Sequence, residues 1–403
     1  MNNAEGWERK TLEQIGTIFS GGTPSTDNKS YWDGDVCWIT PNDLSRIRGP
    51  YIHNSGRKIT VRGLENSAAV IVPANNIVLS SRAPIGYLAI PTVPFSTNQG
   101  CKSIKLNSDQ DVNFHYYNLS FHVDKIKEKG EGTTFAEISK TALSTIKFPV
   151  PTSKVVQSKI AQVLATLDRA IAQTDVLLAK QHRVKAGLMQ EFLGIESAGH
   201  SSRISMSLAS IAEINPARGS LPSVDKASFI TMADVSESAR WLNRQTRRIT
   251  EVKSGYTFFR EGDILLAKIT PCLENGKGCH AIGLENRIGF GSTEFHVIRA
   301  RDNADARFIF QLTKFNHFRQ QAATKMTGSA GQQRVPAQFL ENYPVRELNK
   351  NEQVKIGYVL DAADNAMEVT GNQIAKLQSL KAGLMQDLLT GRVSVLPLMG
   401  DSV

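Results

Sequence analysis

Two long segments of the chain carry apolar residues at a spacing near 3.5 positions and contain no proline. The first spans residues 157–193, and its column comprises Ile160, Leu167, Thr174, Gln181 and Leu188. The second spans residues 353–389, and its column comprises Ile356, Ala363, Thr370, Leu377 and Leu384. This spacing predicts two helices with an apolar seam, each about 37 residues and roughly 55 Å long. We expect them to pair as an antiparallel coiled coil that acts as a spacer, rather than as a hairpin in an ordinary bundle.

The two segments are copies of each other. They align without a gap at an offset of 196 positions, and the run KAGLMQ at 185–190 recurs unchanged at 381–386. This indicates duplication and a pseudo-two-fold internal repeat. The residues expected to pack in the seam or against another chain are Ile160, Leu167, Leu188, Met189, Ile356, Leu377, Leu384 and Met385. Helix retention after a recent duplication explains the identical runs equally well. Thr174 and Thr370 occupy equivalent seam positions, where a polar residue either fixes the register or is simply tolerated.

A globular segment precedes each helix, and these two segments are more weakly related. LEQIGTI at 12–18 resembles LASIAEI at 208–214, and Ile39, Thr40 and Asp43 match Ile230, Thr231 and Asp234. Short β-rich runs broken by Gly, Pro and Asn predict irregular α+β domains. The expected organisation is a domain at 1–150, a helix at 151–193, a linker at 194–204, a domain at 205–347, a helix at 348–392 and a tail at 393–403.

Composition adds only weak constraints. Apolar residues at 41% and charged residues at 21% are typical of globular proteins. A net charge of +9 suits a polyanionic partner, although many basic proteins have none. The four cysteines form no CxxC pair, so we expect no metal site. No apolar run approaches 18 residues and the polar N-terminus resembles no signal peptide, so we expect a cytoplasmic protein with reduced thiols.

Common catalytic motifs are absent from the sequence. It contains no GxxxxGK[ST] phosphate loop, no GxGxxG turn after a strand, no GxSxG elbow and no HExxH pair. The adenine-methyltransferase tetrapeptide, an Asn or Asp followed by two prolines and an aromatic residue, is also missing, because the chain has no Pro-Pro pair. These observations argue against ATP hydrolysis and methyl transfer by this chain. Nuclease chemistry built on scattered carboxylates would leave little trace in a sequence.

The alternation of variable domain and long helix resembles the specificity subunits of type I restriction-modification systems over nearly the whole chain. The motifs that carry the resemblance are GGTPS at 21–25, WITPNDL at 38–44, SSRAPIG at 80–86, STNQG at 96–100, AKITPCLENGKG at 267–278, GSTEF at 291–295 and GQQRVP at 331–336. The resemblance implies two target-recognition domains, each reading one half of a split, asymmetric site in double-stranded DNA. It further implies that the helices set the gap and dock two modification subunits, with restriction subunits joining later. S-adenosylmethionine would belong to the modification subunits and ATP with Mg to the restriction subunits, so this chain would bind no cofactor.

The motif loops are rich in the side chains that contact DNA. Arg and Lys read guanine, Asn and Gln read adenine, and Ser and Thr contact either. The candidate DNA-binding residues are Ser81, Arg82, Asn98, Gln99, Lys268, Thr270, Asn275, Lys277, Thr293, Gln332, Gln333 and Arg334. For each, the alternative is a loop residue that satisfies turn backbone or is merely solvated. Asp43 and Glu294 are as consistent with a role in folding as with a role in DNA binding, because an unpaired carboxylate repels phosphate.

Two other functional classes stay open on the sequence. One is a stand-alone or fused DNA-modifying enzyme with an unrecognised catalytic site. The other is a coiled-coil scaffold with no role on DNA, which the Arg-, Asn-, Gln- and Ser-rich loops argue against.

Overall fold

A computed structural model describes residues 6–82, 84–130, 136–194, 205–329 and 332–398. The chain divides into two compact units, residues 1–175 with 372–403 and residues 176–371. Each unit contains one globular domain and half of each long helix. The expected linker at 194–204 lies outside the described residues apart from Gly194, as do residues 399–403 of the expected tail.

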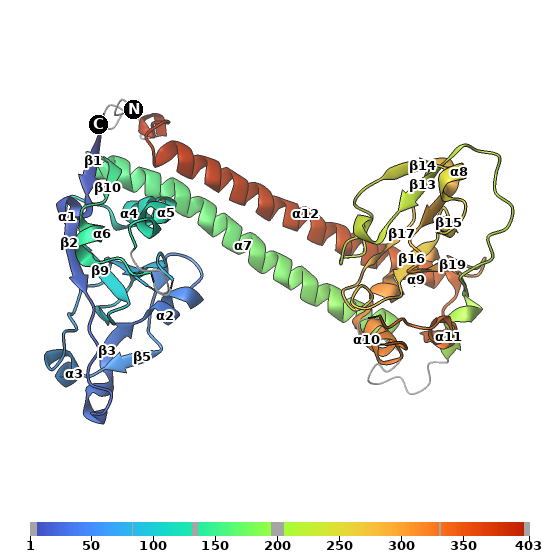
Figure 1. The fold of residues 1–403 in the computed structure, drawn as a ribbon, viewed down its shortest axis with the longest axis horizontal. Helices are drawn as coiled ribbons and strands as arrows, with labels where there is room; N and C mark the ends of the chain where they lie inside the picture. The colour runs from blue at the N-terminus through green and yellow to red at the C-terminus, as the bar shows by residue number, and fades with distance from the viewer. Residues whose placement is uncertain (1–5, 83, 131–135, 195–204, 330–331, 399–403) are drawn as a thin grey trace. The chain divides into compact units, whose positions relative to one another are not determined.

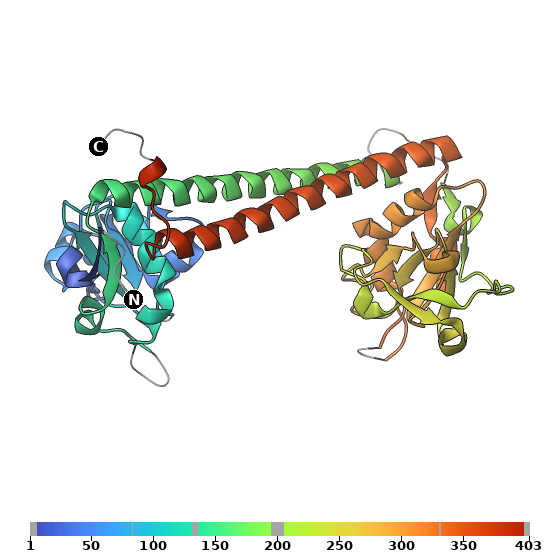
Figure 2. The ribbon, with the colours of Figure 1, turned by 90° about the horizontal axis from the view of Figure 1, so that it is seen from above.

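The two long helices run without a break. They are α7 (Lys154–Leu193) and α12 (Lys350–Leu388), shown in Figure 1 and, in a second view, in Figure 2. Among the helices of the described part of the chain, none is both long and apolar enough to span a membrane. The boundary between the units crosses both helices at equivalent positions, directly after Asp175 and Gly371.

The described residues of the first globular domain form three sheets. Their strand orders are β2-β9-β6-β7-β4, β5-β3-β8 and β1-β10. The strands are β1 (Trp7–Thr11), β2 (Gly16–Ser20), β3 (Trp32–Ile39), β4 (Tyr51–Ile52), β5 (Arg57–Ile59), β6 (Ile77–Ser80), β7 (Leu88–Pro91), β8 (Phe95–Thr97), β9 (Cys101–Leu106) and β10 (Lys147–Pro151). The helices are α1 (Leu12–Ile15), α2 (Pro41–Arg46), α3 (Val61–Glu65), α4 (Val112–Phe121), α5 (Val123–Lys127) and α6 (Lys140–Ser144). Antiparallel pairing of β1 with β10 joins the two ends of the domain just before α7 begins (Figure 1).

The second domain repeats this plan. Its sheets have the orders β12-β19-β16-β17, β14-β13-β18-β15 and β11-β20. The strands are β11 (Ser205–Ser207), β12 (Ala212–Ile214), β13 (Lys226–Ile230), β14 (Gln245–Arg248), β15 (Thr257–Arg260), β16 (Ile264–Ala267), β17 (Gly278–His280), β18 (Ile288–Gly291), β19 (Phe295–Ala300) and β20 (Pro344–Arg346). The helices are α8 (Ile249–Val252), α9 (Ala306–Lys314), α10 (Asn316–Thr324) and α11 (Ala337–Asn342).

Corresponding strands of the two domains pair in the same way. The central antiparallel series β2-β9-β6 corresponds to β12-β19-β16, and the parallel pair β3-β8 corresponds to β13-β18. Because the order and direction of pairing agree, the weak sequence similarity does reflect a repeated α+β domain, which confirms the predicted fold class.

Within each unit the two helices pack antiparallel along an apolar seam, as predicted. In the first unit Ile160 and Leu164, near the start of α7, share a cluster with Leu388, at the end of α12. In the second unit Leu360, near the start of α12, shares a cluster with Met189 and Leu193, at the end of α7. Leu164 and Leu360, which are 196 positions apart, are both fully buried.

The seam candidates differ in burial. Ile160 and Met189 are buried, whereas the other candidates are half-buried: Leu167, Leu188, Ile356, Leu377, Leu384 and Met385. Of the two seam threonines, Thr174 is 8% and Thr370 is 5% exposed, and each hydroxyl donates to a backbone carbonyl one turn earlier in its own helix. That bond satisfies the hydroxyl without any help from the opposite helix.

Candidate nucleic-acid interface

In the first domain, three motif loops meet where β6 and β8 end. Ser81 N donates to Gly100 O at 2.8 Å, and Gly22 N donates to Thr97 O at 2.9 Å. The loop at 21–25 approaches so closely that a Cβ on Gly21 would lie 1.9 Å from Asn98 O. Glycine is therefore required there, and GGTPS packs directly on STNQG.

The exposed candidates of this cluster are Arg82 and Gln99. The Arg82 side chain is 44% exposed, and its Nη1 lies 3.7 Å from Glu137 Oε2. Gln99 is exposed, and its Oε1 accepts a hydrogen bond from the Thr23 hydroxyl at 2.5 Å. Both side chains stay near the protein surface, where they are available to a ligand.

The other two candidates of the first domain face inward. Ser81 is fully buried, and its hydroxyl accepts a hydrogen bond from Lys102 Nζ at 3.2 Å. Asn98 is half-buried, and its Oδ1 has no hydrogen-bond partner among the residues that the structure describes. Ser81 thus supports the loop from inside the domain.

In the second domain, the corresponding loops are joined by backbone hydrogen bonds. Lys268 N donates to Glu294 O at 2.9 Å, Val335 N donates to Lys268 O at 2.9 Å, and Thr270 N donates to Gln333 O at 3.0 Å. These bonds bring together six of the predicted residues: Lys268, Thr270, Thr293, Gln332, Gln333 and Arg334. Thr293 and Gln332 are exposed, and the other four are half-buried.

Asn275 and Lys277 instead tie their loop to the segment before β14. Asn275 Nδ2 donates to Glu237 Oε1 at 3.1 Å, and Lys277 Nζ donates to Met232 O at 3.0 Å. Thr270 also has an internal partner, because its hydroxyl donates to Glu274 Oε1 at 2.5 Å. The side chains of these three candidates are engaged within the domain.

Arg334 forms a bidentate ion pair with Glu294. Its Nε lies 2.9 Å from Glu294 Oε2 and its Nη2 lies 2.8 Å from Glu294 Oε1. The hydrogen bonds from Arg334, helped by the charge of Lys268, lower the pKa of Glu294, and the same bonds raise the pKa of Arg334. The pair therefore stays ionised at neutral pH. The sequence did not decide whether Glu294 serves folding or DNA binding, although its place in the GSTEF motif beside basic loops was a usable signal.

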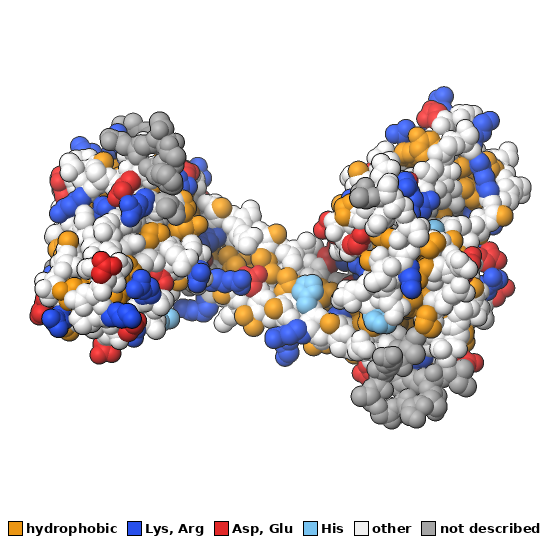
Figure 3. Space-filling model, turned by 60° about the horizontal axis from the view of Figure 1, so that its bottom comes forward, with side chains coloured by type: hydrophobic (Ala, Val, Ile, Leu, Met, Phe, Trp, Pro, Cys, Tyr) orange, Lys and Arg blue, Asp and Glu red, His pale blue; other side chains and the backbone are white. Residues whose placement is uncertain are grey.

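Cations and anions are mixed on the surfaces of the two domains. Figure 3 shows Lys and Arg side chains with Asp and Glu between them on the visible face of each domain. Within the described ranges no three His, Cys, Asp or Glu side chains gather in a way that could hold a metal ion.

Comparison with known proteins identifies the family. A family model described as the type I restriction modification DNA specificity domain matches residues 4–179 and 205–379. The chain belongs to this family. Both recognition domains are matched, each together with the first part of the helix that follows it, which confirms the resemblance noted in the sequence.

Two curated relatives are specificity subunits. The MjaIX subunit of Methanocaldococcus jannaschii is 37% identical over 167 residues, covering 41% of this chain and 38% of the relative. The EcoEI subunit of Escherichia coli is 40% identical over 153 residues, covering 38% of this chain and 26% of the relative. The chain thus spans well under half of the length of these relatives. The crystal structure of the type I S subunit from M. genitalium has a TM-score of 0.61 at 16% identity over 96% of this chain and 97% of that chain, a likeness of fold.

The recognition domains are anchored to the helices by a repeated set of polar contacts that the sequence did not reveal. In the first unit, Asp168 accepts hydrogen bonds from Lys381 Nζ at 2.5 Å and from Tyr117 of α4 at 2.7 Å. In the second unit, Asp364 pairs with Lys185 and accepts a hydrogen bond from Gln311 of α9 at 2.8 Å. The two aspartates are 196 positions apart, and so are the two lysines.

A second repeated contact lies at the start of each long helix. Gln157 Oε1 accepts a hydrogen bond from Asp111 N at 2.8 Å, and Gln353 Oε1 accepts one from Asp305 N at 3.1 Å. Asp111 and Asp305 are the N-caps of α4 and α9, so each recognition domain is held through one of its own helices.

Proposed function

We propose that this chain is the DNA-binding specificity subunit of a type I restriction-modification complex, with each recognition domain reading one half of a split, asymmetric site. The observation that carries this proposal is the loop cluster that both family-matched domains present at corresponding strand ends. The backbone scaffold of the cluster is shared, whereas its surface side chains differ: Arg82 and Gln99 in one domain, Thr293, Gln332 and the partly exposed Arg334 in the other. Two recognition domains that share a scaffold but carry different side chains are suited to two different half-sites.

The long helices offer a surface for the modification subunits. In the second unit, Val176, Val184 and Val369 are 68%, 52% and 67% exposed. Figure 3 shows hydrophobic side chains at the surface of the helices. A contiguous exposed apolar surface is typical of a protein contact. We propose that two modification subunits carrying S-adenosylmethionine dock on the helices and that restriction subunits using ATP and Mg join them, while this chain itself catalyses no reaction.

A domain exchange tests the proposal. Residues 205–347 are replaced by the corresponding domain of a relative, and the variant is expressed with its modification partner. We expect methylation mapping to show that one half of the motif changes and the other half is kept, because each domain is a self-contained unit. The matched control exchanges residues 1–150 and should change only the other half. If either exchange altered both halves or neither half, two independent readers would be excluded.

The isolated chain provides a second control. Incubated with S-adenosylmethionine and DNA, it should transfer no methyl group until the modification subunit is added. DNA binding by the complex should weaken steeply with salt, because phosphate contacts release counterions. Methyl transfer by the chain alone would favour an enzyme instead.

A further inference from the structure

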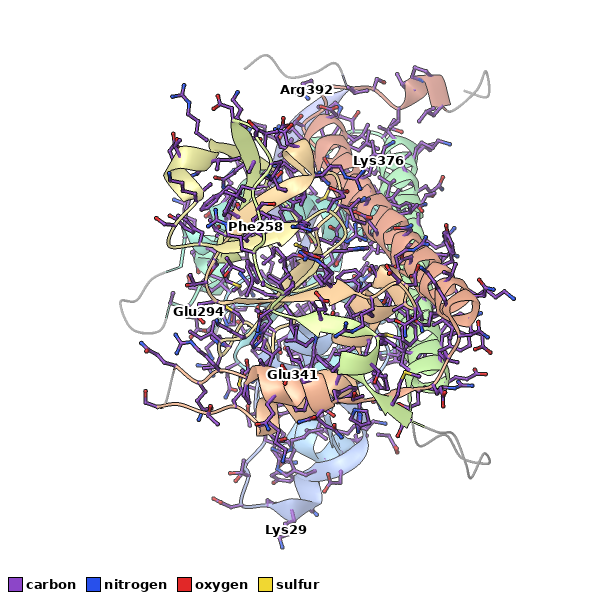
Figure 4. The ribbon with its side chains drawn as sticks, turned by 90° about the vertical axis from the view of Figure 1, so that its right-hand side faces the viewer. Lys29, Phe258, Glu294, Glu341, Lys376 and Arg392 are labelled. Atoms are coloured by element: carbon purple, nitrogen blue, oxygen red, sulfur yellow. The ribbon has the colours of Figure 1, made fainter. Side chains whose placement is uncertain are left out.

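The guanidinium of Arg334 is held in one orientation, but not all of its N–H donors have an acceptor. A guanidinium has five N–H donors. Glu294 accepts from Nε and Nη2, and Gln332 O accepts from Nη1 at 3.1 Å. Two donors remain, one on each terminal nitrogen, and the side chain is 42% exposed. Glu294, at the margin of the second recognition domain, is labelled in Figure 4.

The first recognition domain shows that the fold does not need this ion pair. There the equivalent backbone bonds run from Ser81 N to Gly100 O and from Ile138 N to Ser81 O. The isolated bridge between Arg82 and Glu137 corresponds to the bridge between Ile269 and Arg334. Gly100 therefore stands where the second domain has Glu294, and Glu137 stands where it has Arg334. The backbone scaffold is kept while the side chains at these two positions differ, as expected of a position that sets specificity.

The carboxylate also distinguishes between two kinds of DNA contact. A contact to phosphate relies mainly on net positive charge, which a neighbouring carboxylate offsets. Reading a base needs two parallel donors at a fixed angle, which match O6 and N7 of guanine. Glu294 fixes the Arg334 side chain through Nε and Nη2 and leaves one donor on each terminal nitrogen unpaired. This arrangement supplies the two oriented donors that guanine requires.

We propose that Arg334 reads a guanine in the half-site of the second recognition domain, and that Glu294 is the positioning residue that aims it. This rests on the proposed function and names one base for one domain. Arg334 donates from Nη1 and Nη2 to the guanine, and Glu294 touches only Arg334.

The test uses the complex with its modification partner. Methylation mapping of the wild type first defines the motif, and binding is then measured on that duplex and on duplexes with each G·C pair of the second half-site replaced by A·T. We expect Arg334→Ala to weaken binding to the cognate duplex by roughly 10- to 100-fold and to become indifferent to one replaced pair. Substitution of that guanine by 7-deazaguanine, which lacks N7, should weaken the wild type and leave Arg334→Ala unaffected.

Three further variants sharpen the test. Glu294→Gln should lose discrimination at the same pair, and the double variant should bind no worse than Arg334→Ala, because Glu294 acts only through Arg334. Arg334→Lys keeps the charge but loses the Nε–H that Glu294 orients, so we expect it to discriminate less sharply than the wild type. The control is Arg301→Ala, which removes another exposed Arg–Glu pair, with Glu213, at the opposite end of β19; it should leave discrimination unchanged.

Three results would overturn the inference: a second half-site without a G·C pair, equal weakening on every duplex, or unchanged binding by Arg334→Ala. A wild-type complex that recognises no defined motif would instead refute the proposed function, so the two failures are distinguishable.

Discussion

The same four-residue turn follows the first strand of the parallel pair in both recognition domains. Asp43 Oδ2 accepts hydrogen bonds from the backbone N and the hydroxyl of Thr40, at 2.8 and 2.6 Å. Asp234 Oδ2 accepts the same pair from Thr231, at 2.8 and 2.7 Å. The second oxygen reaches across the domain, to Gly56 N in one copy and to Gln245 Nε2 in the other. Both carboxylates are therefore occupied by the protein.

We expect Asp234→Ala to lower the free energy of unfolding by about 1–3 kcal/mol, because it removes the capping-box partner of Thr231 and a buried acceptor. Asp43→Ala should have a smaller effect of the same sign, since Asp43 is less buried. Chemical denaturation of the full chain measures both, and Asn42→Ala, at an exposed neighbour in the same turn, is the control. An Asp234→Ala variant of unchanged stability that lost selectivity at one base pair would show a DNA contact instead.

At the residue scale, the sequence predicted which loops form the cluster but not which of their side chains point outward. Motif content alone placed Ser81 and Lys277 among the candidate DNA-binding residues, and the structure shows Ser81 buried and Lys277 donating to Met232 O. The direction of a side chain depends on partners that are distant in the chain. Glu137 beside Arg82 and Glu294 beside Arg334 come into place only through tertiary pairing.

At the scale of elements, the duplicated Lys–Asp contact is not equally buried in the two units. Lys381 and Asp168 are each 26% exposed, whereas Lys185 and Asp364 are 9% and 16% exposed. In the second unit Lys314 also binds Asp364, at 2.5 Å, so two ammonium groups share one carboxylate. Burial, and then the like charge of Lys314, lower the pKa of Lys185 to about 8. Burial alone would raise the pKa of Asp364, but the two lysines lower it.

This asymmetry predicts a pH dependence of stability. The ordinary lysine pKa is 10.5, so between about pH 8 and 10.5 the unfolded chain binds more protons at Lys185 than the folded chain does. The stability contributed by Lys185 must therefore rise with pH over that window. We expect the difference in unfolding free energy, wild type minus Lys185→Met, to shift towards the wild type by about 1–2 kcal/mol from pH 8 to pH 10.

Chemical denaturation at several pH values measures this difference. Leu188→Ala, an uncharged change on the same helix, is the control and should shift stability equally at every pH. A constant or falling difference for Lys185→Met would mean that Lys185 is not held in a charge-disfavouring site.

The long helices were the part of the fold that the sequence predicted most fully, because a period near 3.5 and a gapless repeat depend on local pattern alone. The contacts between them were not predictable, since Asp168 and Asp364 lie outside the apolar column. Their spacing matters for the whole molecule. Asp168 and Lys185 are 17 positions apart on α7, and Asp364 and Lys381 are 17 positions apart on α12. Each helix thus contributes an equal length between the contact in the first unit and the contact in the second.

Equal lengths imply that the helices can be extended only together. Four residues added after Thr174 alone would lengthen one side by roughly 6 Å and place the two Lys–Asp contacts out of register. We expect this single insertion to destabilise the chain. Matched insertions after Thr174 and Thr370 keep both contacts, and each four-residue insertion adds roughly 6 Å with a net rotation of about 40°.

If the helices set the gap between half-sites, the matched variant should recognise both original half-motifs at a new separation. DNA advances about 3.4 Å and turns about 35° per base pair, so length favours nearly two added base pairs and rotation favours one. We predict one, because tilting of the helix pair can absorb excess length, whereas a mis-rotated domain faces the wrong part of the groove. Methylation mapping of the matched variant gives the new gap directly, with the single insertion as control. A fully active variant with the original gap would show that the helices do not act as a ruler, and a gain of two would show that length governs the separation.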